Sequence, residues 1–428
     1  MGLGVAGMTT KLRLVVRAAA RFYTSLAVIV LGTLLLLLAV NLVAGLVLQI
    51  KAHHQKEDRK KTLGIATYRD YTKVLERVYP GMSPEQIAAI IHQTDRLCHR
   101  YEPYTQFREN PITSEFVNVD SRGFRRIRNQ GEWPPPRDHL IVFTFGGSTT
   151  FGFRVSDEET IPSYLQEELN KHHGLPPCKV YNFGRMAYMS SQERVLFESL
   201  LAEGHVPDVA VFIDGLNEFI FPDGEPTYTR RLRELMASGE SPGYQQEVMQ
   251  LPVVKLFARS TDGNKLPRAP NDGEVRAVPA SAPSQTIPEP ALRYQANKRM
   301  IEVVAKAFHV TPVFVWQPVP VYGYDKRYNL FGSFNFDVHV PPLRPGYEFM
   351  ADVAHAGRLG PHFIWCGDLQ RGLMEPLYVD AYHYTGPFAK LLASHIAQEM
   401  VSRGLVPRPH RLFHAASPTP SYAGSSDR

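Results

Sequence analysis

The chain has 428 residues, of which 44% are hydrophobic and 21% are charged, and its net charge is +5. These proportions are typical of a globular protein and exclude a chain that is disordered throughout. The basic residues are scattered or flank one apolar segment, so they indicate no nucleic-acid partner. Cys98, Cys178 and Cys366 are too few and too far apart for a zinc site or a disulfide scaffold, although a single bridge stays open. The paired histidines lack a carboxylate cluster, and we predict neither a metal nor a cofactor.

The N-terminal region has the pattern of a membrane anchor. Residues 1–25 are basic and contain no acidic residue, and residues 26–50 contain no charged residue at all. A helix of that length, rising about 1.5 Å per residue, is about 37 Å long and crosses a hydrocarbon core of about 30 Å. The apolar run is too long for the core of a cleaved signal peptide, so we predict a single-pass signal anchor in the lipid bilayer.

The orientation of this anchor is not decided by its flanking charges, because basic residues also follow it at 51–61. The first basic cluster contains no acidic residue, and long C-terminal domains are translocated despite some flanking charge. We therefore favour a cytoplasmic N-terminus, with the large domain periplasmic or otherwise outside the cytoplasm.

Residues 51–137 are predicted to be a helical and aromatic extension that precedes the main domain. Within it, residues 62–100 have helical patterns. Ser83 is a candidate N-cap, Pro84 suits a first helical turn, and isoleucines follow at helical spacing. The next stretch, residues 101–126, is rich in aromatic and turn residues and is more typical of a lid or an edge layer than of a core element.

Residues 138–407 alternate between short apolar strands and amphipathic helices, which predicts a three-layer α/β/α sandwich with a doubly wound, mostly parallel sheet of flavodoxin-like type. The strands are predicted at 140–145, 178–184, 209–213, 311–318 and 362–369, and the helices at 160–172, 190–204, 230–240, 292–310, 350–357 and 387–403.

Two stretches depart from this alternation. Residues 222–290 interrupt it, and the part from 262 onward is rich in Pro, Ala, Ser and Asp, so we predict a flexible insertion there. Residues 408–428 are predicted to be a disordered tail.

A serine stands at the end of the first strand, where open α/β sheets place their chemistry. Ser148 follows two glycines that permit a tight turn. A serine nucleophile needs a base, a group that orients the base, and donors for the developing oxyanion. His383 and Asp380 are three residues apart before the last helix, Gly184 follows the second strand, and Asn217 follows the third. Each strand end therefore contributes a group that suits this chemistry.

Each of these residues also has a simpler interpretation. Gly184 alone is a turn glycine, Asn217 alone caps the next segment, and Asp380 alone caps a helix beside a surface histidine. Glu193 and Glu218 are predicted to lie at the surface or behind the site. What favours the catalytic interpretation is that four such groups fall at the carboxyl ends of successive predicted elements, where one cleft would collect them.

These stretches resemble the four signature blocks of the SGNH, or GDSL-type, hydrolase superfamily. The serine block of that family is Gly-Asp-Ser, whereas residues 146–149 read GGST and lack the aspartate. Gly184 matches the glycine of the second block. Residues 215–218 read GLNE and match the third block, Gly-x-Asn-Asp, with Glu in place of the final Asp. The Asp-x-x-His pattern of the fourth block is intact as Asp380 and His383.

The resemblance implies a Ser-His-Asp triad, with Ser148 as nucleophile, His383 as base and Asp380 as the residue that orients the base. It also implies an oxyanion hole formed by the Ser148 N–H, the Gly184 N–H and the Asn217 side chain. The GGST block is similar to that of the bacterial, envelope-associated branch of the family.

From these observations we predict a membrane-anchored serine esterase that acts through an acyl-enzyme on an acyl ester, most simply an acetyl group on an envelope glycan. Two other classes stay open. An acyltransferase would use the same residues to hand the acyl group to a polysaccharide. A non-catalytic binding or assembly factor for polysaccharide export would use the cleft only to hold its ligand.

Overall fold

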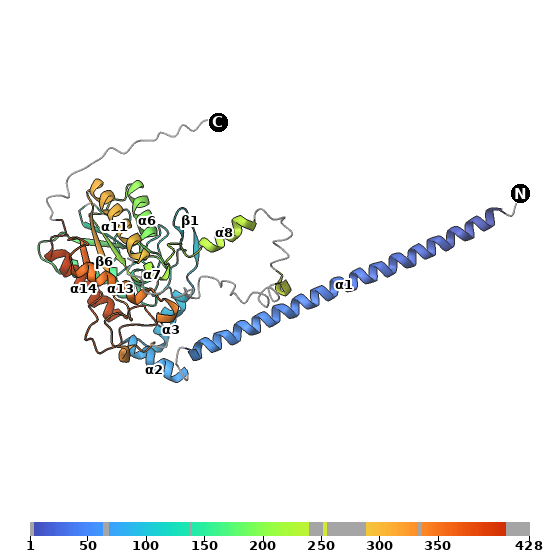
Figure 1. The fold of residues 1–428 in the computed structure, drawn as a ribbon, viewed down its shortest axis with the longest axis horizontal. Helices are drawn as coiled ribbons and strands as arrows, with labels where there is room; N and C mark the ends of the chain where they lie inside the picture. Colours follow the sequence, from blue (N-terminus) through green and yellow to red (C-terminus); the bar gives the residue numbers. More distant parts are fainter. Residues whose placement is uncertain are drawn as a thin grey trace, which may run out of the picture. The chain divides into compact units, whose positions relative to one another are not determined.

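The computed structural model describes residues 4–62, 68–136, 138–238, 251–254, 288–331 and 336–407 (Figure 1). The chain divides into two compact units. One comprises Met1–Thr62 and Arg230–Ala269, and the other comprises Leu63–Thr229 and Pro270–Arg428. The predicted tail at 408–428 and most of the predicted flexible insertion lie outside the described residues.

The first unit contains one long helix, α1 (Gly4–Thr62). Its segment Val15–Ile50 has a mean hydropathy of 2.8 over 36 residues and is long and apolar enough to cross a membrane. The segment predicted from the sequence, residues 26–50, lies within it. The helix predicted at 230–240 is confirmed as α8 (Thr229–Ser238).

A parallel sheet forms the centre of the second unit. In the described part of the chain it has five strands in the order β4-β3-β5-β6-β7, and every neighbouring pair is parallel. The strands are β3 (Leu140–Gly146), β4 (Cys178–Asn182), β5 (Val209–Asp214), β6 (Thr311–Trp316) and β7 (Phe363–Trp365). Counted along the chain this is the order 2-1-3-4-5, so the predicted flavodoxin-like topology is confirmed.

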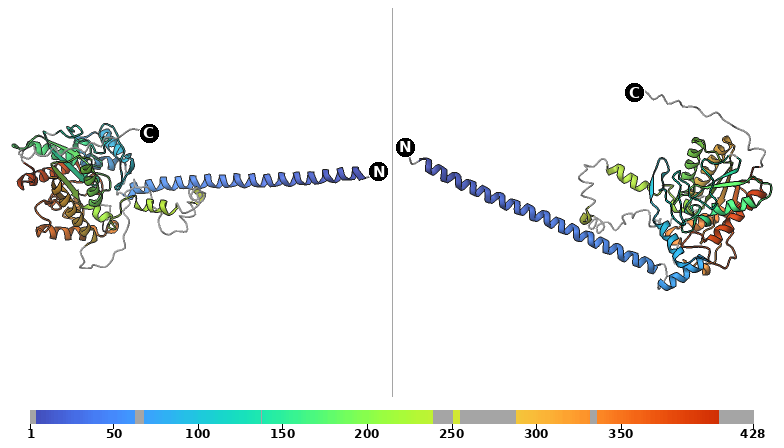
Figure 2. Two further views of the ribbon diagram at one scale, coloured as in Figure 1. Left: turned by 90° about the horizontal axis from the view of Figure 1, so that it is seen from above. Right: turned by 180° about the vertical axis from the view of Figure 1, so that it is seen from behind.

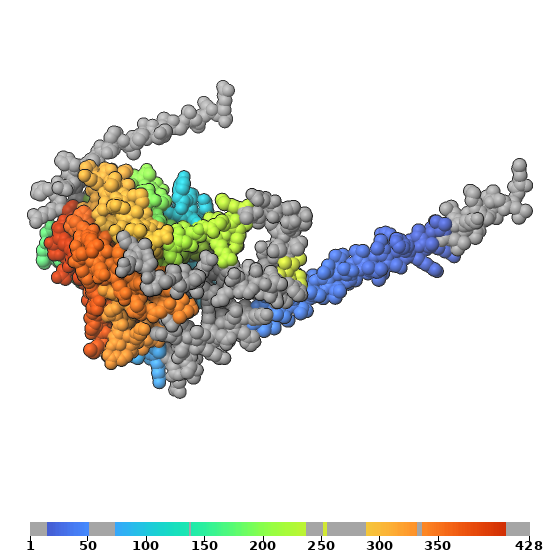
Figure 3. Space-filling model, viewed as in Figure 1, coloured from blue at the N-terminus to red at the C-terminus, as the bar shows by residue number. Residues whose placement is uncertain are grey.

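Helices cover both faces of this sheet, as the views in Figure 2 show. Strand β3 presents Phe143 and Phe145 to one apolar core and Leu140 and Val142 to the other, because side chains alternate along a strand. The first core is closed by α6 (Ser190–Ala202), α11 (Glu289–Ala307) and α13 (Leu343–His355), and the second by α5 (Ile161–Lys171) and α14 (Gly386–Ser402). In Figure 3 residues 288–331 and 336–407, yellow-orange to red, lie next to one another on the face of this unit that is seen. The three-layer α/β/α fold is therefore present.

Local sequence signals explain some helix ends and not others. Thr385 caps α14 by accepting a hydrogen bond from the Phe388 N–H. At α6 the N-cap is Met189, which makes no side-chain capping hydrogen bond, and Ser190 is the first helical residue. The Ser190 N–H donates instead to Glu218 Oε1 at 2.7 Å, so a carboxylate from a distant segment satisfies the helix end.

The extension that precedes the sheet contains two helices and a hairpin. Helices α2 (Tyr68–Val78) and α3 (Pro84–Asp95) are present, and Ser83 caps α3 in a capping box as predicted. The aromatic stretch after α3 forms the antiparallel pair β1 (His99–Glu102) and β2 (Gln106–Glu109), which the turn-rich sequence did not predict. The remaining short helices are α4 (Ser148–Phe151), α7 (Leu216–Ile220) and α12 (Phe336–His339).

A buried arginine of this extension binds the segment that follows strand β3. Arg125 is 1% exposed. Its Nε donates to Asp157 Oδ1 at 3.0 Å, and its other nitrogens donate to the carbonyl oxygens of Phe151, Gly152 and Val155. One planar cation thus satisfies a carboxylate and several carbonyls of a single loop.

Replacing Arg125 with methionine is therefore expected to destabilise the fold by about 3–5 kcal/mol, the usual cost of removing one partner of a buried ion pair. Unfolding of the full-length chain in detergent by denaturant measures this loss. The neighbouring Arg126→Met variant is the control, because Arg126 is exposed and pairs at the surface with Asp120. Equal free energies of unfolding for the two variants would show that the contacts of Arg125 do not stabilise the fold.

Candidate active site

The site lies where strand order reverses, between β3 and β5. The two glycines at the end of β3, Gly146 and Gly147, are required for different reasons. Gly146 has φ of 154°, a conformation that other residues rarely adopt. Gly147 has an ordinary φ of −79°, but a Cβ there would overlap the Asn217 side-chain amide. Ser148 then begins α4 at the carboxyl edge of the sheet.

The structure brings together residues that are 235 positions apart in the sequence. Ser148 Oγ lies 2.8 Å from His383 Nε2, and His383 Nδ1 lies 2.7 Å from Asp380 Oδ2. The His383 backbone N–H also donates to Asp380 Oδ1 at 2.9 Å, so the loop holds the carboxylate and the ring together. Both Ser148 and His383 are buried. This is the geometry in which a histidine can take a proton from a serine hydroxyl.

The Asp380 carboxylate is held in its charged form. Burial would raise its pKa, but the His383 ring, the hydrogen bonds from His383 and the Arg154 guanidinium outweigh burial and hold the pKa of Asp380 well below its usual range. Arg154 Nη1 lies 3.7 Å from Asp380 Oδ2. An ionised carboxylate in this position would stabilise an imidazolium that forms on the histidine.

Asn217 reaches the same edge of the sheet from β5. Gly215, with φ of 144°, turns the chain after the strand, and Asn217 lies in the first turn of α7. The Asn217 Nδ2 donates to the Tyr188 carbonyl at 2.6 Å, which fixes the orientation of the amide against Gly147. The sequence predicted Asn217 at this edge but not the contact that orients it.

The structure gives Gly184 a different environment from the one its predicted role needs. The Gly184 N–H donates to the Asn182 side chain at 2.9 Å, and a Cβ at this position would overlap the backbone of α4. Close packing of two backbones therefore explains the glycine. Its role as an oxyanion donor stays a prediction. Ala187, three residues on, has φ of 57° and precedes the Tyr188 that holds Asn217, a position that no sequence pattern singled out.

The space beside Ser148 is small. The hollow lined by Ser148, Tyr188, Asn217 and Gln317 has a volume of about 10 Å³, which is room for about one water-sized group. Thr149 Oγ1 donates to Gln317 Oε1 at 2.7 Å and so orients the amide that closes one side. A group larger than a water molecule therefore requires the walls of this hollow to move.

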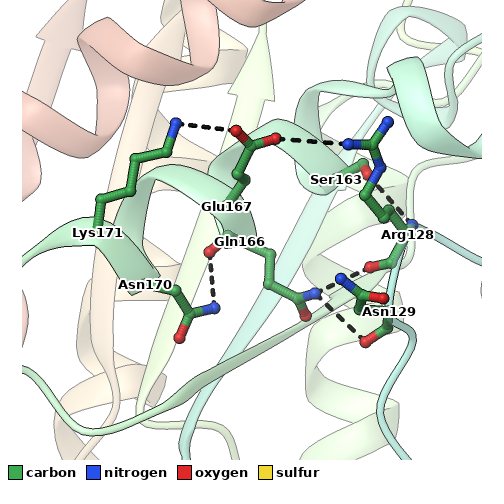
Figure 4. A pocket seen from close by; sticks show the side chains of 7 residues that line it. All are labelled: Arg128, Asn129, Ser163, Gln166, Glu167, Asn170 and Lys171. Carbon is green, nitrogen blue, oxygen red and sulfur yellow. Dashed lines mark hydrogen bonds and ion pairs between the residues drawn. The ribbon is translucent and has the colours of Figure 1, made fainter.

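A larger hollow of about 290 Å³ lies elsewhere, on α5 and the segment before β3 (Figure 4). Several of its polar side chains are paired with one another or with the backbone. Arg128 and Lys171 both pair with Glu167, and Gln166 donates to the backbone of residues 128 and 129. Neither Ser148 nor its partners line this hollow.

Acidic side chains are buried behind the site, which is the second of the two positions predicted for Glu193 and Glu218. Glu193 is 1% exposed and Glu218 is fully buried, and Asp214, at the end of β5, lines the small hollow. Burial, and then the charges of the neighbouring carboxylates, raise the pKa of Glu193 and of Asp214 well above their usual values. Arg293, at 3.5 Å from Glu218, is the cation that offsets part of this charge.

A carboxyl group with a raised folded-state pKa stabilises the fold while it is protonated. Its contribution is fully present below the unfolded value, about 4.5 for Glu193, and is lost as pH rises toward the folded-state pKa. Glu193→Gln removes this titration, so we expect its Tm at pH 8 to exceed that of the wild type by about 2–4 °C, the shift that about 1 kcal/mol produces in a domain of this size.

Thermal unfolding of the full-length chain in detergent between pH 5 and pH 9 measures this difference. Glu203→Gln, in the exposed turn after α6, is the matched control, and its Tm should change with pH as the Tm of the wild type does. If the Tm of Glu193→Gln also changes with pH as in the wild type, the buried carboxyl does not titrate in this range.

Among the described residues, no group of three His, Cys, Asp or Glu side chains is arranged to hold a metal ion. The cysteines at 98, 178 and 366 all lie in the described part of the chain and are free thiols there, so the bridge that the sequence left open is not formed.

No protein-family model matches the chain, and no curated protein matches it. Solved structures that are similar to it include a GDSL-like lipase from Bacteroides thetaiotaomicron, with 12% identity, a TM-score of 0.33 and coverage of 63% of this chain and 91% of that one. A catalytic mutant of an acetylxylan esterase from Geobacillus stearothermophilus is 13% identical, with a TM-score of 0.33 and coverage of 61% and 94%. An alpha/beta hydrolase from the metagenome of Lake Arreo is 12% identical, with a TM-score of 0.33 and coverage of 63% and 96%.

Proposed function

We propose that this protein is a membrane-anchored serine esterase of SGNH type. The observation that carries the proposal is the chain of contacts from Ser148 Oγ to His383 Nε2, at 2.8 Å, and from His383 Nδ1 to Asp380, at 2.7 Å. A serine, a base and a carboxylate in this order are the groups that acyl transfer through a covalent intermediate requires.

In the proposed reaction, Ser148 Oγ attacks the ester carbonyl while His383 accepts the hydroxyl proton. Asp380 stabilises the resulting imidazolium, and His383 then protonates the leaving alcohol. The oxyanion would receive hydrogen bonds from the Ser148 N–H and from the second hydrogen of the Asn217 amide, and, if its bond to Asn182 opens, from the Gly184 N–H. His383 then takes a proton from a water molecule, which attacks the carbonyl of the acyl-enzyme. The proton passes to Ser148 Oγ as the carboxylic acid leaves.

The substrate that we propose is a small acyl ester, most simply an acetyl group carried by an envelope glycan. The hollow of about 10 Å³ beside Ser148 supports a short acyl chain. The apolar segment Val15–Ile50 supports a membrane anchor, and we propose that the catalytic domain lies on the periplasmic side.

The test is to treat the full-length chain in detergent with a fluorophosphonate and to map the labelled peptide. We expect one adduct, on Ser148, together with hydrolysis of aryl acetate at a higher rate than aryl butyrate or octanoate. Absence of both labelling and hydrolysis would contradict the proposal and favour a binding factor. Transfer of acetyl to an added glycan in preference to water would make the protein an acyltransferase instead.

A further inference from the structure

Arg154 connects His383 and Asp380, which we call the acid–base pair, to helices α2 and α3 in the extension that precedes the sheet. On one side, its Nη1 lies 3.7 Å from Asp380 Oδ2. On the other, its Nη2 lies 3.3 Å from Asp95 Oδ1, at the last residue of α3. The guanidinium also lies over the Phe153 ring, whose centroid is 4.8 Å from that of His383. One side chain thus touches both the pair and the extension.

The backbone of Arg154 is held in place from the same extension. Arg154 has φ of 63°, a conformation that costs a non-glycine residue about 1–3 kcal/mol unless its surroundings impose it. The Tyr79 hydroxyl, between α2 and α3, donates to the Arg154 carbonyl at 2.8 Å, and Tyr79 is almost fully buried. The buried Arg125 binds the carbonyl oxygens on either side of Arg154 in the same loop.

A second contact links α2 and α3 to the loop that carries the pair. Val379, which immediately precedes Asp380, packs in one apolar cluster with Val78, Tyr79 and Ile87 from these helices. The Val379 N–H donates to the His383 carbonyl at 2.8 Å, so its position is coupled to that of the histidine. The extension therefore supports the pair through an apolar contact as well as through Arg154.

We propose that helices α2 and α3 are part of the catalytic apparatus, and that they act through Arg154 as a positioning residue for Asp380 and His383. This inference rests on the proposed esterase function. It assigns to the extension the role of holding the carboxylate against the histidine ring, a role that the signature blocks alone do not provide.

The charge of Arg154 acts on the Asp380 carboxylate. Burial raises the pKa of Asp380, and the positive charge of Arg154 is one of the influences that lower it and favour the ionised carboxylate. Removal of that charge leaves the carboxylate with one contact fewer. The charged and titratable groups that face the pair come from α3, the loop after α4, α4 itself and the loop of the pair: Asp95, Arg154, Ser148 and Tyr382.

The test compares Arg154→Gln, Arg154→Lys and Asp95→Asn in the full-length chain, with Arg327→Gln, at an exposed arginine paired with Asp325, as the charge control. For Arg154→Gln we expect kcat at pH 7 to fall about tenfold with little change in KM, because Asp380 loses one of the contacts that hold it against the histidine ring. Arg154→Lys should restore only part of kcat, because an ammonium cannot span both carboxylates. Asp95→Asn should also lower kcat, because the guanidinium loses one of its two carboxylate partners.

A readout that does not need activity separates this inference from the proposed function. In the Ser148→Ala background, NMR of labelled histidine at one fixed pH, assigned by the loss of the signal in His383→Gln, should show a changed His383 ring signal in Arg154→Gln and in Asp95→Asn, because both loosen the hydrogen bond between the ring and Asp380. If the wild type proves inactive but this change appears, only the esterase proposal fails. If both variants keep the wild-type kcat and ring signal, or lower only the Tm, the positioning role is wrong.

Discussion

Ser148→Ala is expected to lower kcat for an aryl acetate by about 10⁴- to 10⁶-fold and to abolish labelling by a fluorophosphonate. The hydroxyl that lies 2.8 Å from His383 Nε2 is the nucleophile in the proposed reaction, and alanine offers no group to replace it. Steady-state kinetics and mass spectrometry of the labelled chain measure the two effects. Ser121→Ala, at an exposed serine in the extension, is the control and should retain full activity.

His383→Ala should cause a loss of similar size, and the double variant Ser148→Ala/His383→Ala should be no slower than either single variant. Residues that act as one unit show this lack of additivity, because the first substitution already removes the covalent route. Unchanged activity of Ser148→Ala or His383→Ala would exclude the triad. A double variant slower than both singles would show that the two residues act in separate steps.

Asn217→Ala is expected to lower kcat by about 10²- to 10³-fold with a small change in KM, the usual loss when one oxyanion donor is removed. Gly147→Ala should reproduce most of this loss, although residue 147 has no functional side chain. A Cβ at 147 would occupy the position of the Asn217 amide and displace it from the Tyr188 carbonyl.

The double variant Gly147→Ala/Asn217→Ala distinguishes this mechanism from general damage to the turn. If the methyl group acts only by displacing the amide, the double variant should be no slower than Asn217→Ala alone. A further loss in the double variant, or wild-type activity of Gly147→Ala, would contradict the steric explanation.

The proposed role of α2 and α3 makes the extension more than a spacer. A helical segment between a membrane helix and a catalytic domain is most simply a spacer, and its sequence contains no motif that indicates more. Under the positioning role that we propose, the contacts of Asp95 and Tyr79 with Arg154 would give it a part in the chemistry. Variants in these helices are therefore expected to change rates as well as stability.

The amino-acid sequence by itself determined the elements of the sheet domain and pointed to the candidate reacting groups. Apolar runs bounded by glycine indicated the strands, and helical spacing with caps indicated the helices, because these signals arise between residues near one another in the chain. The pairing of Asp380 with His383 was predictable for the same reason, since three residues of one loop separate them.

Only the tertiary structure decided which groups meet across the chain. Ser148 and His383 are 235 residues apart, and no local pattern records the distance between their side chains. For Glu193 and Glu218 the sequence left two positions open, at the surface or behind the site, and only the packing of the chain shows that both are buried behind the site. The interaction of Arg154 with both Asp95 and Asp380 likewise depends on packing between segments that the sequence keeps far apart.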